Sequence, residues 1–161
     1  MGGRAHFSAD AVATVSGVRL LSLVLLAGLL LAVSACGSQA NSYRKQVDVV
    51  QKRYAPKLQP LESRLSKAIA SRRTAEAARA ANQASVEMTR FAKDVAAIQP
   101  PSSLQARSTR LVTAYGKLVS SLQQLTLALR SGAPARVNRA ISSYNDARLD
   151  EASAVAALNQ G

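Results

Sequence analysis

The chain has 161 residues and a formal net charge of +12, and it contains no tryptophan, two phenylalanines and four tyrosines. So few aromatic residues argue against a β-sandwich, whose strands need aromatic and β-branched side chains, and favour helices packed through leucine and alanine. The strong positive charge indicates an anionic partner, whose kind depends on where the protein resides.

The chain begins with a segment typical of a signal peptide. Residues 1–19 contain two arginines and one aspartate, and residues 20–33 (LLSLVLLAGLLLAV) form an uncharged apolar run. A helix of this length spans roughly 21 Å, which is short of the roughly 30 Å hydrocarbon core of a bilayer. The run therefore suits the hydrophobic region of a signal peptide better than a membrane-spanning helix.

The chain's one cysteine stands directly after this apolar run. The sequence Val33-Ser34-Ala35-Cys36 combines an aliphatic residue, two small residues and the cysteine, and it resembles the lipobox of bacterial lipoproteins. The resemblance implies cleavage between Ala35 and Cys36, attachment of diacylglycerol to the Cys36 thiol, and an α-amine available for acylation. Two acyl chains hold a protein on a membrane that one chain would bind only reversibly. The alternative is an ordinary signal peptide or a retained anchor, with an incidental buried cysteine.

Three parts of the chain follow from this interpretation. Residues 1–35 are expected to be a removed signal peptide, residues 36–41 the lipidated cysteine and a polar tether, and residues 42–161 a helical domain. The mature chain would keep 19 basic and 8 acidic residues and would have neither histidine nor a free thiol.

The clearest helix is expected over residues 103–131. Pro100-Pro101 and a capping box formed by Ser102 and Gln105 mark its start, and Gly132 marks its end. Its apolar stripe has spacings that alternate between four and three, as in a bundle seam. The stripe consists of Leu104, Ser108, Leu111, Tyr115, Leu118, Leu122, Leu125 and Leu129.

The other three helices are predicted from the same periodicity. Residues 74–99 place alanines and then larger side chains on one face: Ala77, Ala81, Ala84, Met88, Phe91, Val95 and Ile98. The first helix carries a stripe from Tyr43 to Ala68 and is interrupted by Pro56 and Pro60, which predict either one kinked helix or two short ones. The last helix, over residues 135–159, is expected to turn Val137, Ile141, Tyr144, Val155 and Leu158 inward, with Arg148 and Glu151 interrupting the stripe.

Four helices of about 25 residues joined by short turns predict an all-α fold, an antiparallel up-down four-helix bundle whose first helix is kinked at Pro56 to Pro60. A long coiled-coil hairpin that dimerises is the rival, since the apolar seams are narrow.

No pattern in the mature chain points to catalysis. Without histidine or a thiol, the usual pairs of nucleophile and base cannot be formed. Asp146, Asp150 and Glu151 could grip a hard cation, but pairing with Arg148 on a solvated face is the preferred interpretation. We expect neither catalytic residues nor a metal site nor a cofactor beyond the acyl chains on Cys36.

The basic residues provide the remaining signal. Basic side chains crowd the first helix close to the expected lipid, where each would contribute on the order of 1 kcal/mol beside an anionic bilayer. These candidates for binding an anionic surface are Arg44, Lys45, Lys52, Arg53, Lys57, Arg64 and Lys67. The alternative is that they are solvated bases on helix exteriors. Nucleic acid is not an expected partner, because of the expected location and because few aromatic residues are available for base stacking.

The mature chain is similar to small alanine- and arginine-rich helical lipoproteins of high-GC Gram-positive bacteria, many of which have no assigned activity. This resemblance implies a lipid anchor on the extracytoplasmic face of the cell membrane. We expect a non-enzymatic module that binds a protein, an anionic lipid or an anionic envelope polymer. The alternative is a carrier of an apolar ligand or lipid, in a groove between the small residues at Ala77 to Ala84 and the leucine-rich third helix.

Overall fold

The computed structural model describes residues 38–160, and all regular secondary structure in this part of the chain is helical. The elements are α1 (Ser38–Ala70), α2 (Thr74–Ala96), the short 3₁₀ helix η3 (Ser102–Leu104), α3 (Gln105–Ser131) and α4 (Pro134–Asn159). The prediction of an all-α fold is therefore confirmed. The expected signal peptide, its cleavage site at Ala35 and the cysteine Cys36 lie outside the described residues. Among the described helices, none has the length and apolar character needed to cross a bilayer.

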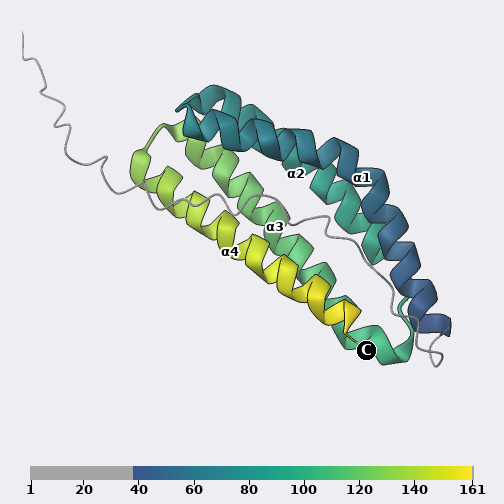
Figure 1. Ribbon diagram of the computed structural model, residues 1–161. Helices are drawn as coiled ribbons and strands as arrows, with labels where there is room; N and C mark the ends of the chain where they lie inside the picture. The colour runs from purple at the N-terminus through teal and green to yellow at the C-terminus, as the bar shows by residue number, and fades with distance from the viewer. Residues whose placement is uncertain (1–37, 161) are drawn as a thin grey trace, which may run out of the picture. The chain divides into compact units, whose positions relative to one another are not determined.

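Helices that are consecutive in the chain pack against one another: α1 on α2, α2 on α3, and α3 on α4 (Figure 1). Between α1 and α2, Tyr54 contacts Asp94 and Lys57 contacts Glu87. Between α3 and α4, Arg110 contacts Ser153 and Lys117 contacts Asp150. In both pairs of helices, the residue number rises along one partner as it falls along the other.

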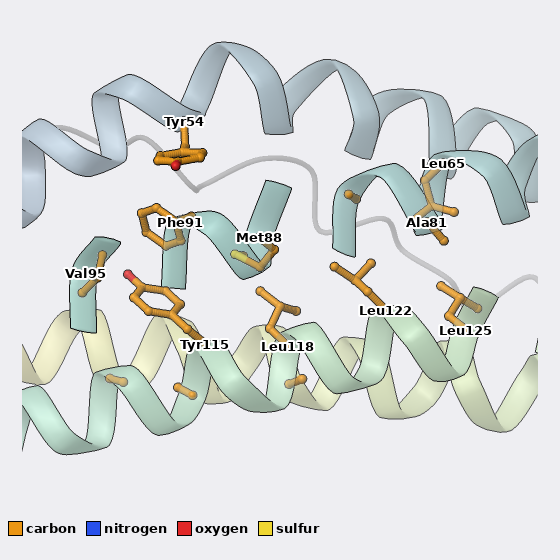
Figure 2. Packing of buried hydrophobic residues seen from close by; sticks show 14 of the residues in the cluster. Tyr54, Leu65, Ala81, Met88, Phe91, Val95, Tyr115, Leu118, Leu122 and Leu125 are labelled. Atoms are coloured by element: carbon orange, nitrogen blue, oxygen red, sulfur yellow. The ribbon is translucent and has the colours of Figure 1, made fainter. Parts of the chain in front are cut away.

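The core is centred on the seam between α2 and α3. All eight positions of the predicted stripe on η3 and α3 are buried, and so are the predicted positions of α2 from Ala77 to Val95. The Phe91 ring lies edge-on to the rings of Tyr115 and Tyr54, with centroid distances of 4.7 and 5.7 Å (Figure 2). Edge-to-face pairs of this kind stabilise a core beyond their buried area.

Helix α1 differs from its prediction at its start. It begins at Ser38, so residues 38–41, expected to lie in a polar tether, form its first turn. The reason lies in the contacts of this turn, because Ala40 packs against the core and Asn41 Oδ1 accepts a hydrogen bond from Arg44. The helix then continues through Pro56 and Pro60, so the alternative of two short helices is wrong.

The predicted capping box at the start of the third helix does not form. Ser102 begins η3 instead, and the backbone N–H of Leu104 donates to the carbonyl of Pro101 at 2.9 Å. Helix α3 then starts at Gln105 without a side-chain cap. The tight turn buries Leu104, which explains why it replaces a regular first turn. The predicted end is correct, since Gly132 adopts the left-handed conformation at φ +66°.

The buried face of α4 is rotated from its prediction. Val137, Ile141, Tyr144 and Val155 are only half-buried, although they pack against the core. The fully buried positions of α4 are Ala140, Ala147, Glu151, Ala154 and Leu158. Three of these five are alanines, and small side chains allow α4 to approach its neighbour closely.

Candidate functional site

Arg44, the first of the predicted surface residues, is buried. Its side chain is only 9% exposed, and its Nε donates a hydrogen bond to the carbonyl of Leu158 at 2.9 Å. A cation at the C-terminus of a helix interacts favourably with the helix dipole and with the unpaired carbonyls there. Arg44 therefore joins α1 to the end of α4, and its assignment to a binding surface was wrong.

The middle of α1 carries predicted basic residues whose charge is offset by nearby carboxylates. Lys45 is exposed, near the start of the helix. The other three exposed cations in this stretch each form an ion pair, with N–O distances of 2.7, 3.5 and 3.6 Å: Lys52 with Asp48, Arg53 with Asp94, and Lys57 with Glu87. Exposed pairs of this kind contribute less than about 1 kcal/mol each, but they reduce the positive potential of the surface.

The last two predicted residues belong to a larger set of basic side chains. Arg64 and Lys67 lie near the C-terminus of α1, close to the turn into α2. Figure 1 shows this turn and the turn from α3 into α4 at the same end of the helical domain. We call the basic residues of the two turns and of the adjoining helix ends the basic end: Arg64, Lys67, Arg72, Arg73, Arg79, Arg130, Arg136 and Arg139.

The charge of the basic end is almost unopposed. All eight side chains are exposed, and residues 64–79 and 130–139 contain one acidic residue, Glu76. Glu76 pairs with Arg73 at 2.7 Å. Within residues 38–160, the other seven basic residues form no ion pair with a carboxylate. The end therefore presents a net charge near +7 to solvent, the strongest local charge in the described part of the chain.

Only Arg64 and Lys67 of this set were candidates from the sequence, because the search was centred on the first helix, and Arg130, Arg136 and Arg139 come from a segment more than 50 residues further along the chain. The signal that could have found the others is the run of basic residues on either side of both turns, combined with the expectation that alternate turns of an up-down bundle share an end.

A second polar feature is a partly buried cluster that links α1 to α4. Arg148 NH1 donates to Glu62 Oε1 at 2.7 Å and to the hydroxyl of Tyr144 at 3.3 Å. Glu151 is 3% exposed, and its Oε2 lies 3.9 Å from Arg148 Nε. Burial raises the pKa of Glu151 to about 7; the charge of Arg148 lowers it, and the charge of Glu62 adds to the rise. This cluster fastens α4 to α1 and contains a carboxyl group that titrates near neutral pH.

The three carboxylates considered as a cation site do not come together. Glu151 is in the core, whereas Asp146 and Asp150 are exposed. Asp150 accepts a hydrogen bond from Lys117 Nζ at 2.6 Å, and this contact lowers the pKa of Asp150. Across residues 38–160, no cluster of three histidine, cysteine or acidic side chains is arranged to hold a metal ion.

The groove expected for an apolar ligand is not open at its predicted place. Ala77, Ala81 and Ala84 are at most 1% exposed. Figure 2 shows Leu65 of α1 and Leu122 and Leu125 of α3 around Ala81. The small side chains of α2 are thus used to bring helices together.

No protein-family model matches the chain, and comparison with curated proteins and with solved structures gives no significant match. Function is therefore inferred from the side chains themselves.

Proposed function

We propose that the protein is a lipoprotein, anchored through Cys36 on the extracytoplasmic face of the cell membrane, that binds an anionic envelope component or a protein and catalyses no reaction. The observation that carries the binding role is the basic end, where seven exposed cations have no carboxylate partner within residues 38–160. Exposed charge of one sign that is left unpaired attracts ligands of the opposite sign.

The anchor rests on the sequence Val33-Ser34-Ala35-Cys36 and its position after the apolar run. In this proposal the signal peptide is removed, diacylglycerol modifies the thiol, and the domain follows the lipid after one or two residues, because α1 already begins at Ser38.

The architecture that suits this role is an antiparallel up-down four-helix bundle in which α1 bends around Pro56 to Pro60. The opposite order of the contacts between α1 and α2 and between α3 and α4 supports this arrangement. A proline inside a helix removes one backbone hydrogen bond and favours a bend. Up-down connectivity places the turn from α1 to α2 and the turn from α3 to α4 at one end, and so gathers the basic residues there.

Intact-mass measurement of protein purified from membranes tests the anchor. We expect loss of residues 1–35 and a mass gain equal to a diacylglycerol, with or without a further acyl chain. The variant Cys36→Ser should retain residues 1–35 and incorporate no labelled palmitate. A wild-type chain of 161 residues with an unmodified thiol would overturn the proposed anchor.

The binding role is tested with the same purified protein in detergent. Incubated with delipidated fragments of the cell envelope, it should sediment with them at low salt and be released at high salt, because salt screens exposed charges. Protein that stays in the supernatant at low salt would argue against an anionic envelope component. Cross-linking in intact cells would then test for a protein partner.

A further inference from the structure

The basic end and the proposed lipid lie at opposite ends of α1. The helix starts two residues after Cys36 and runs without a break to Ala70. At 1.5 Å per residue, its 33 residues span about 50 Å, and Arg64 lies about 40 Å from Ser38 along the helix. Figure 1 shows the start of α1 at the end opposite to the turns that carry the basic residues. This separation is several times the screening length of about 8 Å at physiological ionic strength.

Most of the basic charge along the side of α1 is opposed. Between the lipid and the basic end, Arg44 is turned into the domain, and Lys52, Arg53 and Lys57 are opposed by carboxylates. Within residues 38–63, this leaves Lys45 as the exposed cation without a carboxylate partner. A molecule that lay flat on an anionic membrane would need an unopposed basic stripe along its length. The unopposed charge is instead concentrated at the distal end, so the charge distribution favours a partner that lies away from the anchoring membrane.

The composition of the basic end favours oxyanions. Seven of its eight basic residues are arginines, whereas five of the six lysines of the chain lie elsewhere. The planar guanidinium group donates two parallel hydrogen bonds to a phosphate or carboxylate, which an ammonium group does not. The eight exposed side chains come from the ends of four helices and from the turn between α1 and α2, and they are spread over this end of the domain. Such a spread suits a ligand that repeats its charge along a chain better than a single small anion.

We infer that the basic end binds a linear polymer with repeating phosphate or carboxylate groups, held outside the bilayer that anchors the protein. The inference rests on the proposed lipid anchor for the direction in which the basic end faces. It narrows the proposed function to one surface and one class of ligand.

Processed protein, purified from membranes and placed in nanodiscs of uncharged lipid, is titrated with inorganic polyphosphate and with polyglutamate. The test variant carries Arg79→Glu, Arg136→Glu and Arg139→Glu. The matched control carries Lys93→Glu, Arg110→Glu and Lys117→Glu, three exposed positions outside the basic end, with the same change of charge. We expect salt-dependent binding of at least one polymer, weakened about tenfold or more in the test variant and about threefold or less in the control.

A conservative variant keeps the test valid if the charge reversals disturb folding. Arg79→Lys, Arg136→Lys and Arg139→Lys retain the charge and should still weaken binding severalfold, because the paired hydrogen bonds are lost. Circular dichroism checks that each variant keeps its helical content. Absence of binding to both polymers, or equal losses in the test and control variants, would overturn the inference.

The membrane is the competing partner, and a fluorescent label at Ser131→Cys tests it. In nanodiscs that contain anionic lipid, a label on the basic end should not be quenched by quenchers carried on lipid headgroups. Strong quenching would show that this end folds back onto the bilayer and would also overturn the inference. The proposed anchor and the proposed polymer binding are tested by different measurements on the same sample. An unmodified Cys36 in the mass spectrum would contradict the anchor alone, whereas the titration tests polymer binding.

Discussion

The carboxylate of Glu151 lies in the helical core, with its Oε2 3.9 Å from Nε of Arg148. The same Arg148 makes its short contact, at 2.7 Å, with Glu62 instead. Glu151 is thus a buried acid next to a cation that is already engaged, and burial raises its pKa to about 7. A carboxyl group in such a position is held partly protonated at neutral pH, because burial disfavours its charged form.

This arrangement predicts that stability falls as the pH rises. An unfolded glutamate has a pKa of about 4.3, whereas the pKa of Glu151 in the folded protein is about 7. The stabilisation from its bound proton is complete below about pH 4 and is lost between about pH 4 and pH 7, with a total of about 4 kcal/mol. The variant Glu151→Gln should remove this part of the pH dependence and should unfold at higher urea concentration than the wild type at pH 8.

The matched control for this measurement is Asp146→Asn, which removes an exposed carboxylate from the same helix. Its unfolding free energy should follow the wild-type curve from pH 4 to pH 8. If Glu151→Gln follows the wild-type curve as well, the carboxyl of Glu151 is not the group that couples stability to pH.

Removal of the Arg148 guanidinium group should destabilise the folded protein, because Glu62 and Glu151 both interact with it. In Arg148→Met, Glu62 loses its 2.7 Å partner and Glu151 loses the charge that lowers its pKa. Because the side chain of Arg148 is a quarter exposed, we expect the free energy of unfolding to fall by about 2 kcal/mol at pH 8. This is less than the loss for fully buried ion pairs. In the Glu151→Gln background the same substitution should cost less, which a double-mutant cycle by urea denaturation measures. Equal costs in both backgrounds would mean that Arg148 and Glu151 are not coupled.

The sequence was sufficient to predict the helices with the strongest periodicity. Every stripe residue from Leu104 to Leu129 is buried, since large apolar side chains repeated every three or four residues leave one possible inward face. The face of α4 was not predictable in the same way. Its contact with the rest of the domain is made through alanines and through Glu151, and the pattern of larger apolar residues indicated a neighbouring face.

The candidate site was harder to predict than the helices, because it depends on contacts between residues far apart in the sequence. Arg44 is held inside the domain by the carbonyl of Leu158, 114 residues later in the chain, and no local sequence pattern predicts this contact. Likewise, Arg64 and Arg139 belong to one basic surface because of the way the helices are connected. Charge counts along the sequence locate basic segments, but only the packing of the helices determines which of these segments lie on the same surface.

The seam between α2 and α3 predicts a large difference between two leucines of α3. Leu118 is 1% exposed and packs beside Met88 (Figure 2), whereas Leu127 is 65% exposed. Leu118→Ala should lower the free energy of unfolding by about 3 kcal/mol, from the lost burial and the cavity left behind. Leu127→Ala should change it by less than about 0.5 kcal/mol. Urea denaturation of both variants checks this, and similar losses would show that the seam is not the core of the domain.

The glycine inside α3 and the glycine that follows it should respond to alanine in opposite directions. Gly132 ends the helix at φ +66°, a conformation in which a β-carbon is strained, although no atom lies within 4 Å of the position it would occupy. Gly132→Ala should therefore cost about 1 kcal/mol. Gly116 lies inside the helix, exposed, and a β-carbon there would also meet nothing within 4 Å. Gly116→Ala should stabilise the protein by about 1 kcal/mol, because alanine loses less backbone entropy than glycine on forming a helix. Thermal unfolding of the two variants separates backbone strain from helix propensity, since neither added methyl group makes a new contact. A stabilising Gly132→Ala would mean that α3 does not need a left-handed residue at its end.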